Sequence, residues 1–220
     1  MLRTGLYIDG LNSYHAIADF QRSVPQPEIP RRLHWLDYKK LGVELNRTSV
    51  HGLPSERELV AVKYFVAIPE HREIKADFHR RHIRALEHSG VQIFQGRFKE
   101  HPAKCAACRN TFRQFQEKES DVNLALEMYH DSMMNLVDVI FLLTTDSDLA
   151  AAVKRIQALS SRQVAVVPVS FSSRSASKEL LSLSMNGKVS IRPSLINRCL
   201  LDRVVTTPFG DVRCPDEYWA

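Results

Sequence analysis

Two aspartates, Asp146 and Asp148, follow a short apolar run at residues 137–143. The run is rich in β-branched and large side chains, which predicts a buried strand, and a helical pattern begins directly after the acids. In open α/β sheets, ligand sites lie at this edge, where a strand ends and a helix begins. A simpler alternative is that Asp146 caps the helix and Asp148 favours its dipole. That alternative explains one acid better than two.

Two further acids stand at the ends of predicted elements. Asp9 follows an apolar, β-prone stretch at residues 6–8 and is itself followed by Gly10 and Asn12. Asp121 opens a segment whose apolar residues recur at helical spacing, so it lies in the first turn of a predicted helix. Each of these acids could serve only a turn or a cap. Their combination points to a shared site.

Clustered carboxylates predict chemistry with a divalent cation. Mg²⁺ prefers hard oxygen ligands, and few of them, so that waters and phosphate oxygens complete its octahedral shell. A bound ion would relieve the repulsion between the carboxylates, activate a water and stabilise charge that develops on a phosphate. An aspartyl nucleophile of a phosphatase is an alternative. Leu11 stands two positions after Asp9, where a second aspartate would favour that alternative.

Three blocks, at residues 7–12, 117–125 and 143–149, resemble the signature blocks of the NYN domain, a PIN-like nuclease group that includes the LabA-like proteins. The resemblance covers residues 3–195. It implies a PIN-like, Rossmann-like α/β fold with three α/β/α layers and a central, mainly parallel sheet. It also implies a ribonuclease, expected to be an endonuclease, that hydrolyses RNA phosphodiester bonds with Mg²⁺ or Mn²⁺.

The resemblance assigns roles to individual side chains. The carboxylates expected to bind metal and carry the reaction are Asp9, Asp121, Asp146 and Asp148. Within this group, we expect Asp9 and Asp146 as direct ligands, and Asp121 and Asp148 as ligands through water or as residues that orient a water. The residues assigned to substrate are Asn12, Lys118, Thr145 and Ser147. Many relatives carry glycine in place of Thr145, and a side chain there would crowd a phosphate. The alternative is therefore an RNA-binding module of the same fold that is weak or inactive as an enzyme.

Strands alternate with helices along the chain, which predicts a parallel sheet with right-handed crossovers. Strands are expected at residues 6–8, 59–68, 91–98, 137–143, 164–169 and 189–191. Helices are expected from residue 13 and at residues 37–45, 73–88, 121–133, 149–156 and 177–183. The proline-bearing stretches 21–30 and 46–58 are expected to be loops. We expect one domain over residues 1–198, and a tail over 199–220 that packs on it or is mobile.

The expected helix at residues 73–88 has a basic face. Its cations are Arg72, Lys75, Arg80, Arg81 and Arg84. A solvated surface is favoured for such a face, and a stripe that follows RNA phosphates is the alternative. His79, His82 and His88 are interpreted as surface or helix-packing residues. Four aromatic residues, Trp35, Tyr38, Phe112 and Phe115, are assigned to the core in preference to stacking on single strands.

An insertion near residues 101–115 carries Cys105 and Cys108 at the spacing of a zinc knuckle. Zinc takes four ligands, so the others would come from His101, from Cys199 and Cys214, or from a second subunit. Free thiols are favoured over structural zinc, and redox activity is a further alternative. Four cysteines in 220 residues do not form a disulfide framework.

Charge and hydropathy limit the partners and the location. The formal charge of +5 and the isoelectric point near 9.1 suit a polyanion such as RNA. No apolar run approaches the roughly 18 residues of a membrane span, and the first residues lack the apolar region of a signal peptide. We therefore expect a cytoplasmic protein without membrane association, and a homo-oligomer is compatible with the sequence.

Overall fold

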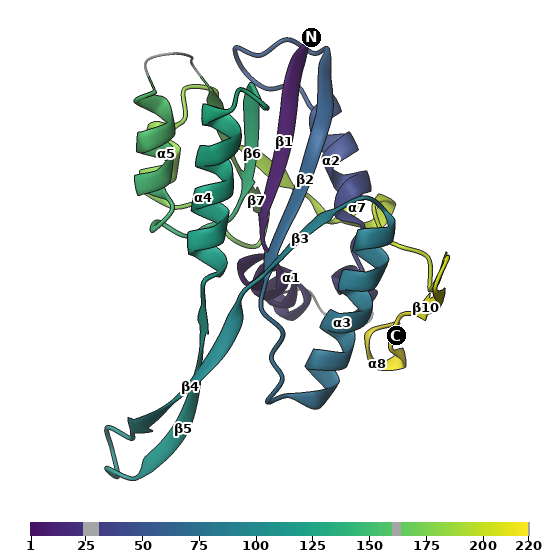
Figure 1. The fold of residues 1–220 in the computed structure, drawn as a ribbon, viewed down its shortest axis with the longest axis vertical. Coiled ribbons are helices and arrows are strands. Elements are labelled where there is room, and N and C mark those ends of the chain that lie inside the picture. The colour runs from purple at the N-terminus through teal and green to yellow at the C-terminus, as the bar shows by residue number, and fades with distance from the viewer. Residues whose placement is uncertain (24–30, 160–163, 220) are drawn as a thin grey trace.

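The computed structural model describes residues 1–23, 31–159 and 164–219. Six strands form one sheet in the order β3-β2-β1-β6-β7-β8, and every neighbouring pair is parallel (Figure 1). Their bounds are β1 Leu2–Asp9, β2 Arg57–Val66, β3 Gln92–Gln95, β6 Val139–Leu143, β7 Ala165–Phe171 and β8 Val189–Ile191. After β1, the chain adds β2 and then β3 on one side of it. It then crosses to the other side of β1, where it adds β6, β7 and β8 in turn. The order therefore reverses between β1 and β6.

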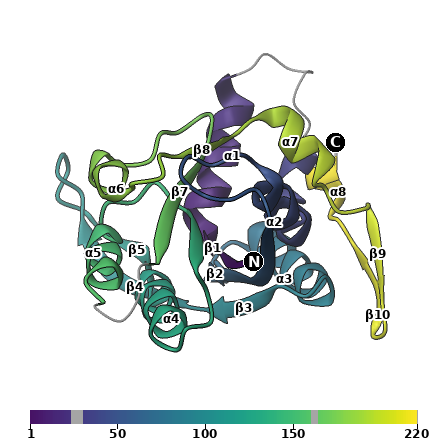
Figure 2. The ribbon, with the colours of Figure 1, turned by 90° about the horizontal axis from the view of Figure 1, so that it is seen from above.

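Helices cover both faces of the sheet (Figure 2). One face packs against α1 Gly10–Ser23, α2 Tyr38–Arg47, α3 Glu73–His88 and α7 Pro193–Arg198. The other face packs against α4 Ser120–Met133, α5 Ala150–Gln157 and α6 Lys178–Leu183. Successive β1 residues alternate between these cores: Leu6 and Ile8 lie in the first core, and Tyr7 lies in the second. The predicted three-layer α/β/α fold is confirmed.

The start of α1 lies unusually close to β2. A Cβ atom on Gly10 would lie 2.6 Å from the carbonyl oxygen of Phe65, so only glycine fits there. This close approach turns the chain directly from the end of β1 into α1. It fixes Asp9, the last residue of β1, at the edge of the sheet.

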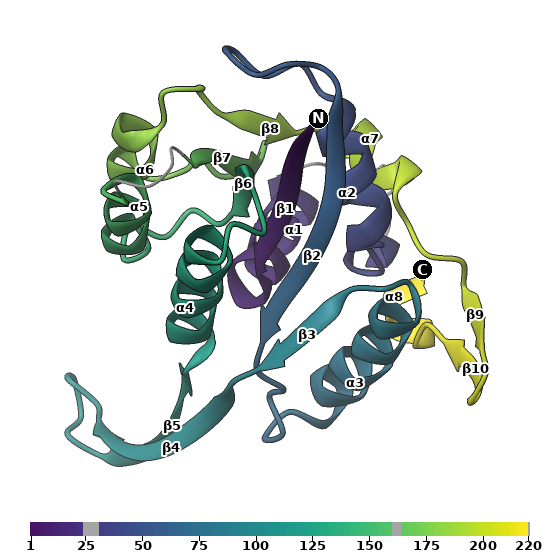
Figure 3. The ribbon, with the colours of Figure 1, turned by 45° about the horizontal axis from the view of Figure 1, so that its top comes forward.

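The expected strand at 91–98 is confirmed only over β3, because the chain breaks at Gly96 and Arg97 begins the first strand of a hairpin. This hairpin consists of β4 Arg97–Lys104 and β5 Thr111–Lys118, which pair antiparallel and project from the domain (Figures 1 and 3). A Cβ atom on Gly96 would lie 2.5 Å from Ser120 Oγ and 2.6 Å from the Lys118 carbonyl oxygen. The hairpin therefore leaves and returns at the same place, next to the start of α4.

Both expected loops are shorter than predicted. Helix α1 continues to Ser23, so residues 21–23 are helical, and the rest of the expected loop at 21–30 lies outside the described residues. Asp37 caps α2 by accepting hydrogen bonds from the next helix N–H groups, and the helix continues to Arg47. Strand β2 begins at Arg57, two residues before the expected start, and ends at Val66.

The C-terminal residues form regular structure that their sequence does not predict. They fold into β9 Val204–Thr207, β10 Gly210–Arg213 and α8 Asp216–Trp219. Val212, Cys214 and Tyr218 are buried in a cluster with Trp35 and Phe78, which joins them to α3.

Within the described residues, no helix is both long and apolar enough to cross a membrane.

Candidate active site

A hollow of about 490 Å³ lies at the carboxyl ends of β1 and β6, where the strand order reverses. Asp9 ends β1 and Asp146 follows β6, and both line the hollow. Asp121, in the first turn of α4, lines it from another element. Because β1 and β6 pair in parallel, with Ile8 opposite Leu143, their terminal acids arrive at the same edge. We call this cavity the acid hollow.

Asp9 is a buried carboxylate held by two donors. Its side chain is 7% exposed. The backbone N–H of Asn12 donates to its Oδ1 at 3.0 Å, and the hydroxyl of Thr144 donates to its Oδ2 at 2.8 Å. Burial raises the pKa of Asp9 to about 6, with the charges of Asp121 and Asp146 acting in the same direction and the two hydrogen bonds opposing it.

The loops after β1 and β6 are tied together by hydrogen bonds. Thr144 Oγ1 accepts from the N–H of Asp146 at 3.1 Å, so one hydroxyl links both carboxylates. The side-chain amide of Asn12 donates to Thr145 Oγ1 at 3.0 Å and accepts from the Thr145 N–H at 3.2 Å. Thr145 therefore holds Asn12. Sequence reasoning missed Thr144, although its place between β6 and Asp146 is a signal.

Besides Glu119, which forms an ion pair with Arg97, Glu117 at the end of β5 is a further carboxylate in the acid hollow. It accepts hydrogen bonds from Ser120 Oγ and from the N–H of Ala67. Burial raises its pKa to about 7, and the charges of Asp9 and Asp121 add to the rise. Sequence reasoning missed Glu117 because the hairpin that returns it to the sheet edge was not predicted. Its place at the head of block 117–125 was the available signal.

The remaining predicted site residues lie at or beyond the rim. Asp121 and Lys118 line the hollow and are exposed, whereas Asp148, Ser147 and Thr145 do not line it. Partial burial, followed by the charges of Asp146 and Asp148, raises the pKa of Asp121. The N–H of Asp148 donates to Asp146 Oδ1 at 2.9 Å.

Arg174 adds a cation to the rim of the acid hollow. It follows β7 and forms an ion pair with Asp19 of α1. Sequence reasoning missed it, because no motif marks this arginine. Together with Lys118 it gives the rim two positive charges beside the carboxylates.

We expect the substitution Glu117→Gln to stabilise the fold at pH 8 but not at pH 4.5. The folded-state pKa of Glu117, about 7, lies above the ordinary glutamate value, so the folded protein binds the extra proton. The stability that proton binding by Glu117 gives the folded protein is fully present below pH 4 and is lost as the pH rises through 7. Glutamine is neutral at every pH, so the substitution raises stability only where Glu117 would be charged. Thermal melting at both pH values tests this, with exposed Glu87→Gln as the control. An equal shift at both pH values would contradict it.

A second acidic group lies on α4, away from the acid hollow. Ligand atoms of Glu127, His130 and Asp131 lie within 4.8 Å of one another. However, Lys63 Nζ lies 2.6 Å from Asp131 Oδ2 and 2.7 Å from Glu127 Oε2, and the Tyr7 hydroxyl also donates to Asp131. The Lys63 ammonium already forms an ion pair with each of the two carboxylates, so we interpret the group as a structural ion-pair network.

The basic face predicted for α3 divides into two parts. Arg80 and Arg81 form ion pairs with Glu70 and Asp77, as expected of a solvated surface. Arg72 and Lys75, at the start of the helix, instead line two hollows beside the acid hollow.

The histidine and aromatic residues considered in the sequence differ in their burial. His79, His82, Trp35 and Tyr38 are buried, His88 and Phe112 are exposed, and Phe115 lines a hollow.

The four cysteines do not gather at one zinc site. Cys199 and Cys214 are buried in two different clusters of the domain, whereas Cys105 and Cys108 lie at the tip of the projecting hairpin. The suggestion that the buried pair completes a zinc site is therefore wrong. Among the described residues, no third metal-binding side chain is grouped with Cys105 and Cys108.

Comparison with known proteins identifies the family. The profile of the NYN domain matches residues 3–184. The chain belongs to the NYN domain family. This confirms the resemblance carried by the three sequence blocks and places the chain in a nuclease-like superfamily.

Two known proteins are similar to this chain. The 6-hydroxy-3-succinoylpyridine 3-monooxygenase HspA of Pseudomonas putida (strain DSM 28022 / S16) is 29% identical over 234 residues, covering 93% of this NYN chain and 72% of that protein. A crystal structure of a protein of unknown function, VPA0982 from Vibrio parahaemolyticus RIMD 2210633, matches with a TM-score of 0.55 at 20% identity, covering 91% of this chain and 96% of that one. The latter likeness concerns the fold alone.

Proposed function

We propose that this NYN protein is a divalent-metal-dependent ribonuclease, acting as an endonuclease, that hydrolyses RNA phosphodiester bonds in the acid hollow. The observation that carries the proposal is the convergence of Asp9, Glu117, Asp121 and Asp146, from β1, β5, α4 and the β6 loop, on one hollow at the reversal of strand order. Burial and mutual repulsion raise the pKa values of Asp9, Glu117 and Asp121. A set of hard oxygen donors that repel one another fits a divalent cation.

In this proposal the chain's residues have separate tasks. Asp9 and Asp146 hold Mg²⁺ or Mn²⁺, and Asp121 and Asp148 act through water. The ion supplies charge stabilisation for the phosphate and lowers the pKa of a bound water. Glu117, with a pKa of about 7, is placed to accept a proton near neutral pH. Lys118 and Arg174 meet the phosphate from the rim.

The side chains beyond the hollow complete this assignment. Asn12 and Thr145 join the two loops that carry the direct ligands, so we assign them to positioning, with contact to substrate as a second role. Ser147 is exposed beside Asp146 and is assigned to substrate as well. The cytoplasmic location and RNA as partner belong to the same proposal, and the charge of +5 supports the latter.

A cleavage assay tests the proposal. Internally and terminally labelled single-stranded RNA is incubated with the protein in Mn²⁺, Mg²⁺ or EDTA, beside a phosphomonoester. We expect metal-dependent internal cutting of the RNA and no release of phosphate from the monoester. Tight RNA binding without cutting in any metal would support the inactive RNA-binding module instead. Hydrolysis of the monoester alone would favour a phosphatase.

A second candidate function rests on the relative named as a monooxygenase, which covers most of this chain. Oxygenation of a small aromatic acid would use the hollows beside the acid hollow, where Tyr14 and Lys75 offer an aromatic ring and a cation. Consumption of oxygen and reduced nicotinamide that depends on an added hydroxypyridine would support this function. If adding the hydroxypyridine leaves the consumption of oxygen and reduced nicotinamide unchanged, the oxygenase function is ruled out.

A further inference from the structure

Two further hollows continue from the acid hollow around α1. A middle hollow of about 350 Å³ shares His15 and Glu117 with the acid hollow. An outer hollow of about 720 Å³ shares Tyr14 and Lys75 with the middle one. The three cavities therefore adjoin. We call the middle and outer hollows together the side groove, which leads from the carboxylates past the start of α3 to α8.

Aromatic rings form one wall of the side groove. His71, between β2 and α3, stacks on Phe115 of β5 with ring centroids 3.9 Å apart and an interplanar angle of 4°. Phe98 of β4 meets the same imidazole edge-on, with centroids 5.2 Å apart. All three rings line the middle hollow, and His71 is exposed. Such a stack beside a carboxylate cluster offers a flat surface to an unpaired base.

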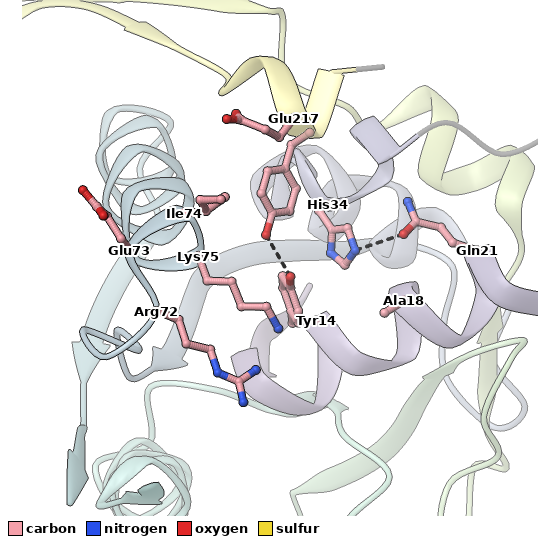
Figure 4. A pocket seen from close by; sticks show the side chains of 10 residues that line it. Tyr14, Ala18, Gln21, His34, Arg72, Glu73, Ile74, Lys75 and Glu217 are labelled. Atoms are coloured by element: carbon pink, nitrogen blue, oxygen red, sulfur yellow. Dashed lines mark hydrogen bonds between the residues drawn. The ribbon is translucent and has the colours of Figure 1, made fainter. Parts of the chain in front are cut away.

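Two cations, Arg72 and Lys75, lie where the middle and outer hollows meet. Lys75 Nζ lies 5.2 Å from the centre of the Tyr14 ring, and Arg72 reaches the same space from the start of α3 (Figure 4). Within the described residues, neither forms an ion pair with a carboxylate. Burial, and then the charge of Arg72, lowers the pKa of Lys75. Both charges are available to an anionic group such as a phosphate.

Two buried imidazoles support the groove walls. His34 lines the outer hollow at 6% exposure and His79 lines the middle hollow at 5%. In each ring Nδ1 has no hydrogen-bond partner among the described residues, whereas His34 Nε2 contacts Gln21 (Figure 4). Burial lowers both pKa values to about 3, so the rings are neutral. Both Nδ1 atoms are covered by neighbouring protein atoms, so the two rings support the groove walls and do not themselves contact a base.

We propose that the side groove holds unpaired nucleotides of the same RNA strand whose cleaved phosphate lies in the acid hollow, an inference that rests on the proposed function. A base stacks against the His71–Phe115 pair, and the adjoining phosphate meets Arg72 and Lys75. Bases inside a duplex stay stacked on one another and cannot enter the groove. The groove therefore selects single-stranded over double-stranded RNA.

Binding measurements test this without depending on cleavage. Fluorescence anisotropy in EDTA gives the affinity for a labelled 12-nucleotide single strand and for its duplex. Both affinities are measured for the Asp146→Asn protein and for the same protein with one further substitution. We expect Phe115→Ser to weaken single-strand binding by about tenfold. We expect Lys75→Gln to lower, by about 0.7, the slope of the logarithm of the binding constant against the logarithm of the salt concentration. Phe112→Ser, on the same strand, and Arg84→Gln, on the same helix, are the matched controls and should change binding less than about twofold.

The outcomes separate the groove from the nuclease. Equal losses for Phe115→Ser and Phe112→Ser, or a duplex bound as tightly as the single strand, would overturn the groove even if the protein cuts RNA. If Phe115→Ser alone weakens single-strand binding, and the protein cuts no RNA, the proposed role of the side groove stands and the proposed nuclease activity does not.

The hairpin tip carries a second, independent inference. Cys105 and Cys108 lie in a tight turn, in which the N–H of Cys105 donates to the carbonyl oxygen of Asn110 at 2.9 Å. Arg109 follows in the left-handed region at φ 60°, and its N–H donates to the Cys105 carbonyl at 2.9 Å. A tight turn that carries two thiols three positions apart at a hairpin tip fits one half of a zinc knuckle.

We infer that the two cysteines supply half of a zinc site that a second copy of this chain completes. Zinc requires four ligands, and a two-fold axis through the metal supplies two from each hairpin. The hairpin projects from the domain, so two tips can meet without contact between the domains (Figure 3). Lys104 and Arg109 beside the thiolates offset the negative charge of a four-thiolate zinc centre.

Zinc content and molar mass, measured together on reduced protein, test this inference. We expect a dimer with about one zinc per two chains, and Cys105→Ser should yield a zinc-free monomer with an unchanged melting temperature. His101→Ala is the matched control and should remain a zinc-bound dimer. A zinc-free monomer, a monomer with one zinc per chain, or a dimer that survives Cys105→Ser would each overturn it.

Discussion

Replacement of Asp146 by asparagine is expected to lower RNA cleavage at least about 100-fold, because a direct metal ligand stabilises charge in the transition state by several kcal/mol. The substitution is nearly isosteric, and an asparagine oxygen can still accept the hydrogen bond that Asp146 Oδ1 receives from the Asp148 N–H. It also removes a charge that repels Asp9 and Asp121. The melting temperature should therefore stay the same or rise.

The assay is single-turnover cleavage of labelled RNA in Mn²⁺. Asp211→Asn, at an exposed position on β10, removes the same charge outside the acid hollow and should leave the rate unchanged. Full activity of Asp146→Asn would contradict its assignment as a ligand. A loss of activity that follows a loss of folded protein would instead assign Asp146 to stability.

Replacement of Lys63 by methionine is expected to lower the free energy of unfolding by about 3 kcal/mol, because it strips a buried carboxylate of its cation. Lys63 is 7% exposed and Asp131 is 2% exposed, and their charged atoms lie 2.6 Å apart. Burial alone would raise the pKa of Asp131, but hydrogen bonds from Lys63 and Tyr7 outweigh it and lower the pKa. Methionine retains the apolar stem of lysine, so packing changes little.

Urea unfolding of Lys63→Met measures this loss, with Lys154→Met at an exposed position on α5 as the matched control. Adding Asp131→Asn to Lys63→Met should restore part of the stability, since the uncompensated charge is then absent. Recovery on adding Mn²⁺ to Lys63→Met would show that a metal can replace the ammonium there. An unchanged free energy of unfolding would contradict the account of this network.

The sequence predicts the sheet and the position of its acids well. Apolar runs such as 137–143 are long enough to identify buried strands, and parallel strands bring their following residues to one edge. This places Asp9 and Asp146 together before any coordinates are known. Asp121 is located by the helical spacing of the residues that follow it.

The missed features depend on contacts between distant segments. Strands β4 and β5 are mostly exposed and lack the clean apolar alternation that would have marked a hairpin, so the return of Glu117 to the site was not predicted. Thr144 gains its role only because β6 lies beside β1. The hollows beside Lys75 likewise need α1, α3 and α8 to come together, which no local pattern encodes.

The most direct test of the central claim is a crystal of the protein grown with Mn²⁺ and measured at the manganese absorption edge. The account predicts an anomalous peak in the acid hollow, within bonding distance of Asp9 and Asp146, and its absence from an Asp146→Asn crystal. A peak at Glu127 and Asp131 with none in the acid hollow, or no peak at millimolar Mn²⁺, would contradict it.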